Sequence, residues 1–339
     1  MRKHSDYYSK RVQLRKRRLL FKRVRCVLML LALVFALFFL HSLVSIAKNL
    51  PQQIKQSPEL QKIQSTSQEL ESTPQQDKES ENLGNLKTEI ASYLKNYKGQ
   101  YGVYYYDILS GQEFGINDED QYTGASDEKI PINLYLYNKI KSGAVNPEGT
   151  LTYLQEDYEG GTGGIQYEKV GTRYTVEDLS GLSIVDSDNV AANMLIRFLG
   201  MQNIKDYMQQ VGGQVVVDGQ NVSSPRDMGL YMKLVYEFCE NNGTLGDDLM
   251  NNFLNTDFND RLPALLPKSV KVAHKIGNDV GVVNDVGIVF AAKPYIVAVM
   301  SKGVNEEEAI GNRKYIQNDL RFGDARIVCP GNWLWSYHI

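Results

Sequence analysis

Two side chains that could carry out acyl transfer stand three residues apart, Ser126 and Lys129 in the run Ser-Asp-Glu-Lys. Residues at this spacing share one face of a helix, so the hydroxyl and the amine are expected within hydrogen-bond reach. A neutral lysine can take the proton of a serine hydroxyl and turn it into a nucleophile. The four histidines are scattered along the chain. We therefore expect no Ser-His-Asp triad, no metal site and no cofactor.

Two further motifs follow in order, Ser187-Asp188-Asn189 and Lys275-Ile276-Gly277. S-x-x-K, S-D-N and K-[ST]-G are the three signatures of serine enzymes that use lysine as the activating base. Two are intact here, and Ile276 is the single substitution in the third. The chain resembles the penicillin-recognising serine enzymes, most closely their class A β-lactamase-like branch. The resemblance covers residues 85–320.

Other matches to these motifs occur at Ser45 to Lys48, at Ser92 to Lys95 and at Lys141-Ser142-Gly143. The last of these has a basic residue followed by glycine, which is typical of a helix C-terminus. Only Ser126 is followed, at suitable distances, by the sole S-D-N and by a K-x-G that enters strand-like sequence. We therefore assign the nucleophile to Ser126.

The resemblance implies four catalytic residues, Ser126, Lys129, Ser187 and Lys275. Lys129 would be the base, and burial beside the second cation of Lys275 would lower its pKa. Ser187 would bridge the two lysines and carry a proton to the leaving nitrogen.

The resemblance also implies four substrate-binding positions, Asn189, Ile276, Gly277 and Asn278. Asn189 would orient Lys129 and the amide of the substrate. The backbone N–H groups of Ser126 and Asn278 would form an oxyanion hole. Gly277, without a side chain, would let substrate lie close to the strand edge.

The chain departs from the class A pattern in the segment after S-D-N. Those enzymes release the acyl group through a Glu-activated water, but the segment Val215 to Asn221 contains no Glu. Asp218 is its only acid and has a shorter side chain. Because general-base catalysis contributes about 10²–10⁴-fold, deacylation is expected to be slow.

The binding of a substrate carboxylate is also expected to be weaker than in the family. Ile276 removes the hydroxyl of K-[ST]-G, and Val283 leaves no arginine on the neighbouring strand segment. Carboxylate binding would then rest on Lys275, with help from His274.

The elements that position these residues are expected within 85–320. Strand patterns lie at both ends, at Tyr101–Ile108 with a short second strand, Val270–Ala273, Val282–Phe290 and Tyr295–Ser301. Helical patterns fill the middle and both flanks: Leu86–Tyr97, Lys129–Ile140, Asn189–Phe198, Asn203–Val211, Pro225–Asn241 and Glu306–Leu320. This order predicts an α/β fold of the β-lactamase/transpeptidase type with two lobes. An antiparallel sheet flanked by helices would form one lobe, and helices alone the other.

The N-terminal part has a different composition. Eleven of the 37 Lys and Arg residues but one of the 40 acids lie in residues 1–25, so the remainder carries a net charge of −13. Residues 27–47 contain no Asp, Glu, Lys or Arg and are long enough to cross a bilayer. Basic flanks stay inside. We expect a cytoplasmic segment 1–26, a transmembrane helix 27–47 and a disordered extracellular tether 48–84.

With this topology, the chain would be a single-pass protein of the cell membrane, and its catalytic domain would lie outside the cell. A cleaved signal peptide is the alternative, with Ser45 and Ala47 as small residues before the cut. The basic block is not expected to bind nucleic acid, because it directly precedes the apolar run. The three cysteines are widely spaced, and the tail 321–339 has no family counterpart.

The sequence thus predicts a membrane-anchored extracellular serine hydrolase that is acylated at Ser126 by a β-lactam or a related amide. The first alternative is a D-alanyl-D-alanine peptidase-like, penicillin-binding enzyme on peptidoglycan peptides. The second is a catalytically idle module that binds the cell wall or a partner. Retention of two lysines in the motifs argues against the idle module.

Overall fold

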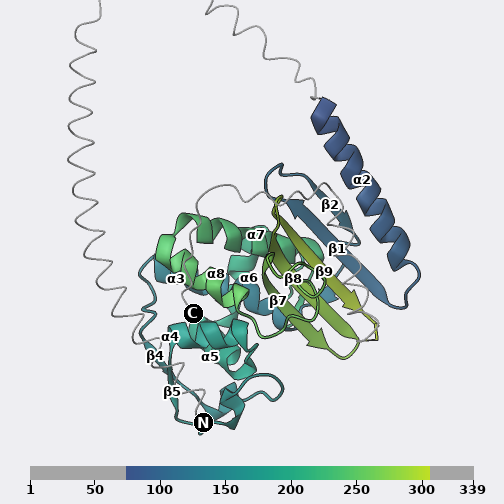
Figure 1. Cartoon of the computed structure of the whole chain (residues 1–339). Helices are drawn as coiled ribbons and strands as arrows, with labels where there is room; N and C mark the ends of the chain where they lie inside the picture. Colours follow the sequence, from purple (N-terminus) through teal and green to yellow (C-terminus); the bar gives the residue numbers. More distant parts are fainter. Residues whose placement is uncertain (1–73, 306–339) are drawn as a thin grey trace, which may run out of the picture. The chain divides into compact units, whose positions relative to one another are not determined.

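A five-stranded antiparallel sheet, in the order β2-β1-β9-β8-β7, forms the framework of the computed structural model, which describes residues 74–305 (Figure 1). The first strand of the domain pairs with the last along its whole length, from Gln100 opposite Lys302 to Asp107 opposite Tyr295. The expected sheet from both ends of the domain is confirmed. The strands are β1 (Gln100–Asp107), β2 (Glu113–Ile116), β7 (Lys271–Asp279), β8 (Val282–Phe290) and β9 (Tyr295–Lys302).

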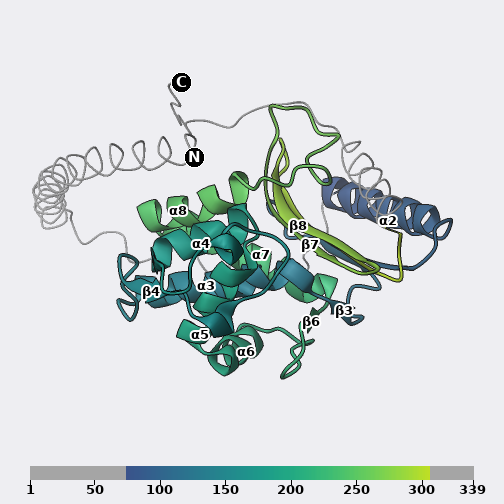
Figure 2. The same ribbon diagram turned by 90° about the horizontal axis from the view of Figure 1, so that it is seen from below.

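Helices cover both faces of this sheet, with α2 (Pro74–Leu94) on one side and α7 (Pro225–Asn241) on the other (Figure 2). The coverage explains the composition of β8, in which eight consecutive residues are buried and β-branched residues dominate. Strand β7 lies at one edge of the sheet. The lysine of the third motif therefore stands on an edge strand that faces the helical part of the domain.

The outer layer of the core joins α2 to the sheet. Ile90 and Leu94 are buried against β-strand residues such as Val103 and Val297. Leu83 and Leu86 extend this apolar stripe toward the N-terminus.

Helix α2 begins at Pro74, whereas the sequence predicted a tether up to residue 84 and a folded domain from residue 85. Pro at a helix start and the helix-favouring Gln, Glu and Lys that follow explain why a segment read as tether is helical.

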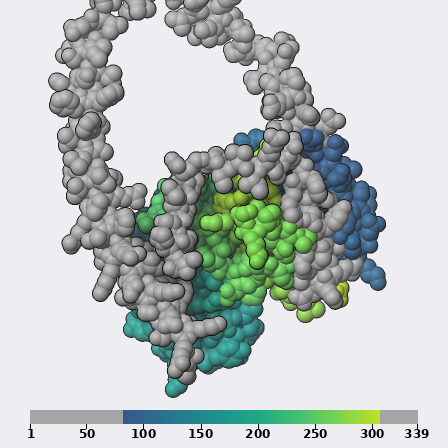
Figure 3. Space-filling view, in the orientation of Figure 1, coloured from purple at the N-terminus to yellow at the C-terminus, as the bar shows by residue number. Residues whose placement is uncertain are grey.

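The inner layer of the core joins the sheet to the helical lobe. Helix α7 approaches β1 closely at Gly229, where a Cβ atom would lie 2.2 Å from the Tyr104 ring. In the space-filling view, the light-green surface of the segment from α8 toward β7 lies between the teal helical lobe and the blue α2 (Figure 3). The lobe consists of α3 (Lys129–Lys141), α4 (Val176–Val185), α5 (Asn189–Leu199), α6 (Met201–Gln210) and α8 (Gly243–Leu254).

Small elements complete the described part of the chain. Two two-stranded sheets pair β3 with β6 and β4 with β5. The strands are β3 (Tyr122–Thr123), β4 (Thr150–Thr152), β5 (Arg173–Thr175) and β6 (Val222–Ser223), and the 3₁₀ turns are η2 (Ala125–Glu128), η3 (Gln155–Asp157) and η4 (Ile165–Tyr167).

Apart from the start of α2, most expected elements agree with the structure to within a few residues, and three others differ. Strand β7 runs on to Asp279, because pairing with β8 carries it through polar residues that break the apolar run. Helices α4 and α8 were not expected. The Thr175 hydroxyl that accepts from the N–H of Asp178 caps α4, so a capping signal was present.

Several sequence predictions fall outside the described residues: the cytoplasmic segment 1–26, the transmembrane helix 27–47, the tether up to residue 73 and the closing helix 306–320. The tail 321–339 lies outside them too. Between residues 74 and 305, none of the helices combines the length and apolar character that a membrane crossing needs.

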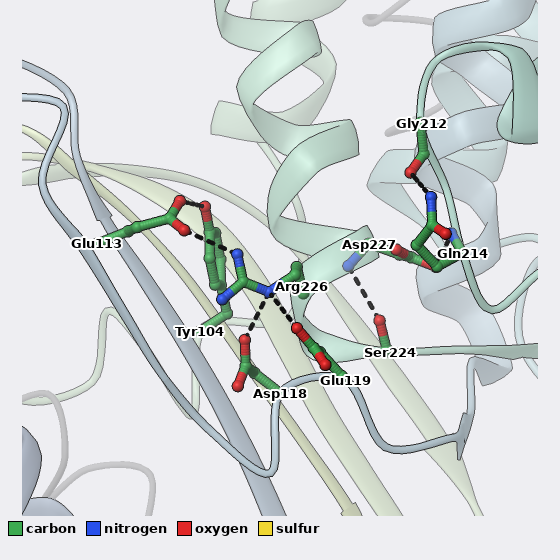
Figure 4. Close-up of polar contacts among 9 residues, drawn as sticks. All are labelled: Tyr104, Glu113, Asp118, Glu119, Gly212, Gln214, Ser224, Arg226 and Asp227. Carbon is green, nitrogen blue, oxygen red and sulfur yellow. Dashed lines mark hydrogen bonds and ion pairs between the residues drawn. The ribbon is translucent and has the colours of Figure 1, made fainter.

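The N-terminus of α7 is fastened to the β1–β2 hairpin by Arg226 (Figure 4). Its guanidinium donates to Glu113 at 2.7 Å and to Asp118 at 2.8 Å, and it lies 5.0 Å from the centre of the Tyr104 ring. The hydroxyl of Tyr104 donates to the same Glu113 at 2.5 Å. One side chain thus joins a helix, a strand and a loop.

We expect Arg226→Met to lower the free energy of unfolding by about 1–2 kcal/mol, measured by urea denaturation. Charge-assisted hydrogen bonds of this kind contribute about 1.5–3 kcal/mol, and solvent screening at this half-exposed site reduces that value. The control is Glu119→Gln, because Glu119 is 82% exposed and 3.6 Å from the guanidinium. An equal loss of unfolding free energy in the two variants would contradict the stabilising role of Arg226 between α7 and the hairpin.

Candidate active site

The expected nucleophile lies in the tight turn η2, which leads directly into α3. Ala125, just before Ser126, has a positive φ of 48°. A non-glycine residue in this region costs free energy and persists only where its surroundings hold it. The turn is held from two sides, by the sheet and by the loop that precedes α7.

The sheet holds the turn through Asn284 on β8 and Gly277 on β7. The side chain of Asn284 donates to the carbonyl of Thr123 at 2.9 Å. A Cβ atom on Gly277 would lie 2.8 Å from the carbonyl oxygen of Gly124 and 3.0 Å from the carboxylate of Asp127. The expected role of Gly277 in the close approach of substrate stays a prediction. The structure shows that the missing Cβ also leaves room for the turn that carries Ser126.

The loop holds the turn through Asn221, whose side chain donates to the carbonyl of Ala125 at 3.0 Å. Its own carbonyl accepts from the N–H of Gly124 at 3.1 Å. Below this contact, buried Lys205 lies 3.4 Å from the carboxylate of Glu128 and donates to the carbonyl of Gln220 at 3.1 Å. Burial raises the pKa of Glu128 to about 6, against the opposing charge of Lys205.

The Lys129 amine is surrounded by oxygen atoms of the first two motifs. It lies 3.0 Å from the Ser126 hydroxyl, 2.8 Å from Oδ1 of Asn189, and 2.7 Å and 3.3 Å from the carbonyl and hydroxyl of Ser187. The side chain is buried. Burial lowers the pKa of Lys129 to about 8, although the charges of Glu159 and Asp188 act in the opposite direction. A base of this pKa is partly neutral near pH 7.

The third motif brings a second buried amine to the same hydroxyl. Lys275 on β7 donates to the Ser187 hydroxyl at 2.8 Å and to the carbonyl of Ile276 at 2.9 Å. It is fully buried. Burial, and then the neighbouring charge of Lys129, hold the pKa of Lys275 far below its usual range. The Ser187 hydroxyl therefore bridges two lysines from different lobes.

The three side chains of the S-D-N turn point in different directions and have different partners. Ser187 has a positive φ of 53°. Asp188 caps α5 by accepting from the N–H of Ala191 at 2.9 Å, and its other oxygen accepts from the N–H of Ile165 at 2.9 Å. Asn189 offers its oxygen to Lys129 and its amide nitrogen to the carbonyl of Gly160 at 3.1 Å. The motif is thus both a helix cap and part of the site.

The remaining expected binding positions lie at the end of β7. The side chain of Ile276 is 5% exposed, so its carbonyl is the group that contributes to the site. Asn278 is exposed and pairs with Val283 of β8. Both roles stay predictions.

The expected contribution of His274 to carboxylate binding is wrong. Alternation along β7 places it on the opposite face from Lys275. There it is fully buried, and its Nδ1 lies 2.8 Å from the carboxylate of Asp285.

Sequence reasoning missed Arg261, a cation close to the third motif. Arg261 is 2% exposed and donates to the carbonyl of Asn284 at 2.9 Å. Its charge is among the influences that lower the pKa of Lys275. Leu262, the next residue, donates its N–H to Asp285 at 3.0 Å. Arginine in an irregular segment carries no motif, so no sequence signal marked it.

The arrangement as a whole can transfer an acyl group. A serine faces a buried amine of lowered pKa, and a second hydroxyl links that amine to another buried amine. Such a site has a nucleophile, a base and a path for the proton. Fold and site together define the class of serine hydrolases that use lysine as the base.

Comparison with known proteins agrees with this class. Residues 85–317 match the β-lactamase enzyme family. The chain is 25% identical over 245 residues to the β-lactamase ROB-1 of Haemophilus influenzae, covering 66% of this chain and 79% of the relative. It is 24% identical over 284 residues to the β-lactamase VEB-1 of Pseudomonas aeruginosa, covering 75% and 91%.

A solved structure of PBP-A superimposes with a TM-score of 0.66 and 26% identity, covering 70% of this chain and 94% of that one. A mutant of PBP-A has been solved as an acyl-enzyme complex with penicillin G. The chain belongs to the β-lactamase enzyme family and is a serine hydrolase of the class A β-lactamase-like type.

We expect the free energy of unfolding of the wild type to rise relative to that of Lys275→Met between pH 7 and pH 10. The lysine binds fewer protons in the folded state than in the unfolded chain over this range, so stability increases with pH, by up to about 1.4 kcal/mol per pH unit. Denaturation at several pH values measures this slope.

The matched control is Lys271→Met on the same strand, at an exposed position. Its curve should stay parallel to that of the wild type. A parallel curve for Lys275→Met as well would contradict the lowered pKa.

Proposed function

We propose that this serine hydrolase is acylated at Ser126 by a β-lactam or a related amide, and that the acyl-enzyme is released slowly. The observation that carries the proposal is the 3.0 Å contact between the Ser126 hydroxyl and the Lys129 amine, whose pKa is lowered to about 8. The amine can then exist in its neutral form when substrate arrives.

Acylation would proceed through three proton transfers. Lys129 takes the Ser126 proton as Oγ attacks the carbonyl carbon. The tetrahedral intermediate then breaks its carbon–nitrogen bond. The Ser187 hydroxyl gives its proton to the leaving nitrogen and regains one from Lys129, 3.3 Å away, while Lys275 at 2.8 Å holds the hydroxyl in place. The backbone N–H groups of Ser126 and Asn278 would stabilise the oxyanion.

An anionic substrate fits the charges around β7. Lys275 lies 2.8 Å from the Ser187 hydroxyl, and Arg261 is a second buried basic side chain whose charge acts on Lys275. Opposite charges attract strongly where water is excluded. A carboxylate next to the scissile bond, as in a β-lactam or a D-alanyl-D-alanine terminus, would be held there despite the absence of a hydroxyl at Ile276.

Slow release is supported by the loop that precedes α7. It contains no Glu, and its one acid, Asp218, is exposed. Glu128 directs its carboxylate to Lys205. Without a base to activate water, hydrolysis loses about 10²–10⁴-fold.

The slow release also supports the second candidate, a D-alanyl-D-alanine peptidase-like enzyme that acts on peptidoglycan peptides and binds penicillin as an inhibitor. An idle binding module is disfavoured, because two buried lysines destabilise the fold and have no purpose without the chemistry.

We also propose that the domain works outside the cell membrane. The support is in the sequence: eleven basic residues in 1–25, followed by the apolar run 27–47. A single N-terminal helix would hold the enzyme near the cell wall.

The test is to incubate the full-length chain with a fluorescent penicillin and to follow the intact mass over time. We expect one adduct that persists for many minutes in the wild type and no adduct in Ser126→Ala. Ser92→Ala is the matched control, because it alters another S-x-x-K match and should be labelled normally. Rapid loss of the adduct would favour a true β-lactamase, and no adduct in the wild type would refute the proposal.

The acylation rate should rise with pH up to about 8 and then level off. Below this pH, Lys129 is mostly protonated and the rate increases about tenfold per pH unit at most, because only the neutral amine accepts the proton. Initial rates of adduct formation between pH 6 and 9 measure this pH dependence. The rates of Asp218→Asn, which removes the acid of the loop, should follow the same curve. A rate that falls over this range would rule out Lys129 as the base.

A further inference from the structure

We propose that Thr162 is a positioning residue of this active site, which holds the left-handed Ser187 turn and thereby keeps the Ser187 hydroxyl between Lys129 and Lys275. The proposal rests on the proposed acylation at Ser126 and adds a residue outside the three motifs. It is carried by the contacts between the S-D-N turn and the glycine-rich loop 160–164.

The Ser187 turn needs an external restraint. A φ of 53° on a residue with a side chain costs of order 1–3 kcal/mol. A relaxed turn would move the hydroxyl, which must stay 2.8 Å from one amine and 3.3 Å from the other. Correct placement of this hydroxyl therefore depends on what holds the backbone of Ser187.

Two donors share the carbonyl of Ser187. The Thr162 hydroxyl donates to it at 2.7 Å, and the Lys129 amine donates at 2.7 Å. A carbonyl oxygen has two lone pairs, so both are used. Lys129 is a reacting group that exchanges its proton during catalysis, and Thr162 is the donor that stays in place throughout.

The loop that carries Thr162 is fitted closely to the turn. The N–H of Asn189 donates to the Thr162 carbonyl at 3.2 Å. At Gly163 the φ is 99°, and a Cβ atom would lie 2.5 Å from the Cα of Asp188. Only glycine allows this approach. The side chain of Asn189 also donates to the Gly160 carbonyl. The loop therefore contacts the S-D-N turn both before and after Thr162.

Loss of the Thr162 hydroxyl should also change the titration of Lys129. The Ser187 carbonyl would then accept a hydrogen bond from the Lys129 ammonium alone, and this stronger bond stabilises the protonated form and raises the pKa of Lys129. The other charged groups that act on Lys129 are Lys275, Glu159 and Asp188. None of them is removed by a substitution at Thr162.

The experiment compares Thr162→Val, which keeps the shape, with Thr162→Ser, which keeps the hydroxyl. Thr172→Val is the matched control, because its hydroxyl makes a 2.8 Å bond to the Lys169 carbonyl in the same lobe, away from the motifs. All are measured as full-length chains for the rate of penicillin adduct formation against pH, and for urea stability.

We expect Thr162→Val to acylate about tenfold more slowly, the effect of one hydrogen bond of about 1.4 kcal/mol. Its pH midpoint should move upward. Thr162→Ser should stay within about threefold of the wild type, and Thr172→Val should be unchanged. The proposal is overturned if Thr162→Val keeps the wild-type rate and midpoint, or if the serine variant falls as far as the valine variant.

A second readout separates this proposal from the proposed function. Lysine labelled with ¹³C at Cε reports the titration of Lys129 in the free protein by NMR, with Lys129→Met identifying the signal. A wild type that forms no adduct would refute acylation by penicillin, but an upward shift in Thr162→Val alone would still support the positioning role. An unshifted signal would overturn it.

Discussion

The active site depends on one hydroxyl that accepts hydrogen bonds from two buried amines. Ser187 joins Lys129 of the helical lobe to Lys275 of the sheet. Each amine would be protonated in water, and burying both near each other disfavours holding two charges. The pair therefore favours having a neutral member, which is the form that general-base catalysis requires. The free-energy cost of burying these lysines is met by the rest of the fold, including both layers of the core.

The strained backbone of the site is concentrated at two of the motifs. Ala125, beside Ser126, and Ser187 both have positive φ, and each is held by segments distant in sequence. Asn221 and Asn284 hold the first, and the loop around Thr162 holds the second. The motifs supply the reacting groups, and the surrounding loops supply the geometry. This division explains how a site can combine family motifs with loops of its own.

The sequence allowed the sheet, most helices and the meeting of Ser126, Lys129, Ser187, Asn189 and Lys275 to be predicted, because motif order and apolar periodicity are local signals. It did not reveal Arg261 or Thr162, whose importance comes from which backbone they reach. It misplaced His274, since neighbouring strand residues face opposite sides of a sheet. The predicted start of α2 was too late, because a charged, solvent-exposed helix and a solvated tether have similar amino-acid compositions.

The pairing of the first strand with the last has a consequence for biosynthesis. Strand β1 can complete its hydrogen bonds only after β9 has left the ribosome, and Lys275 arrives with the same late segment. Contacts so far apart in sequence also form slowly. The growing polypeptide thus carries Ser126 without the second amine until Lys275 has been added. A product truncated before residue 271 would lack Lys275 together with β7, β8 and β9.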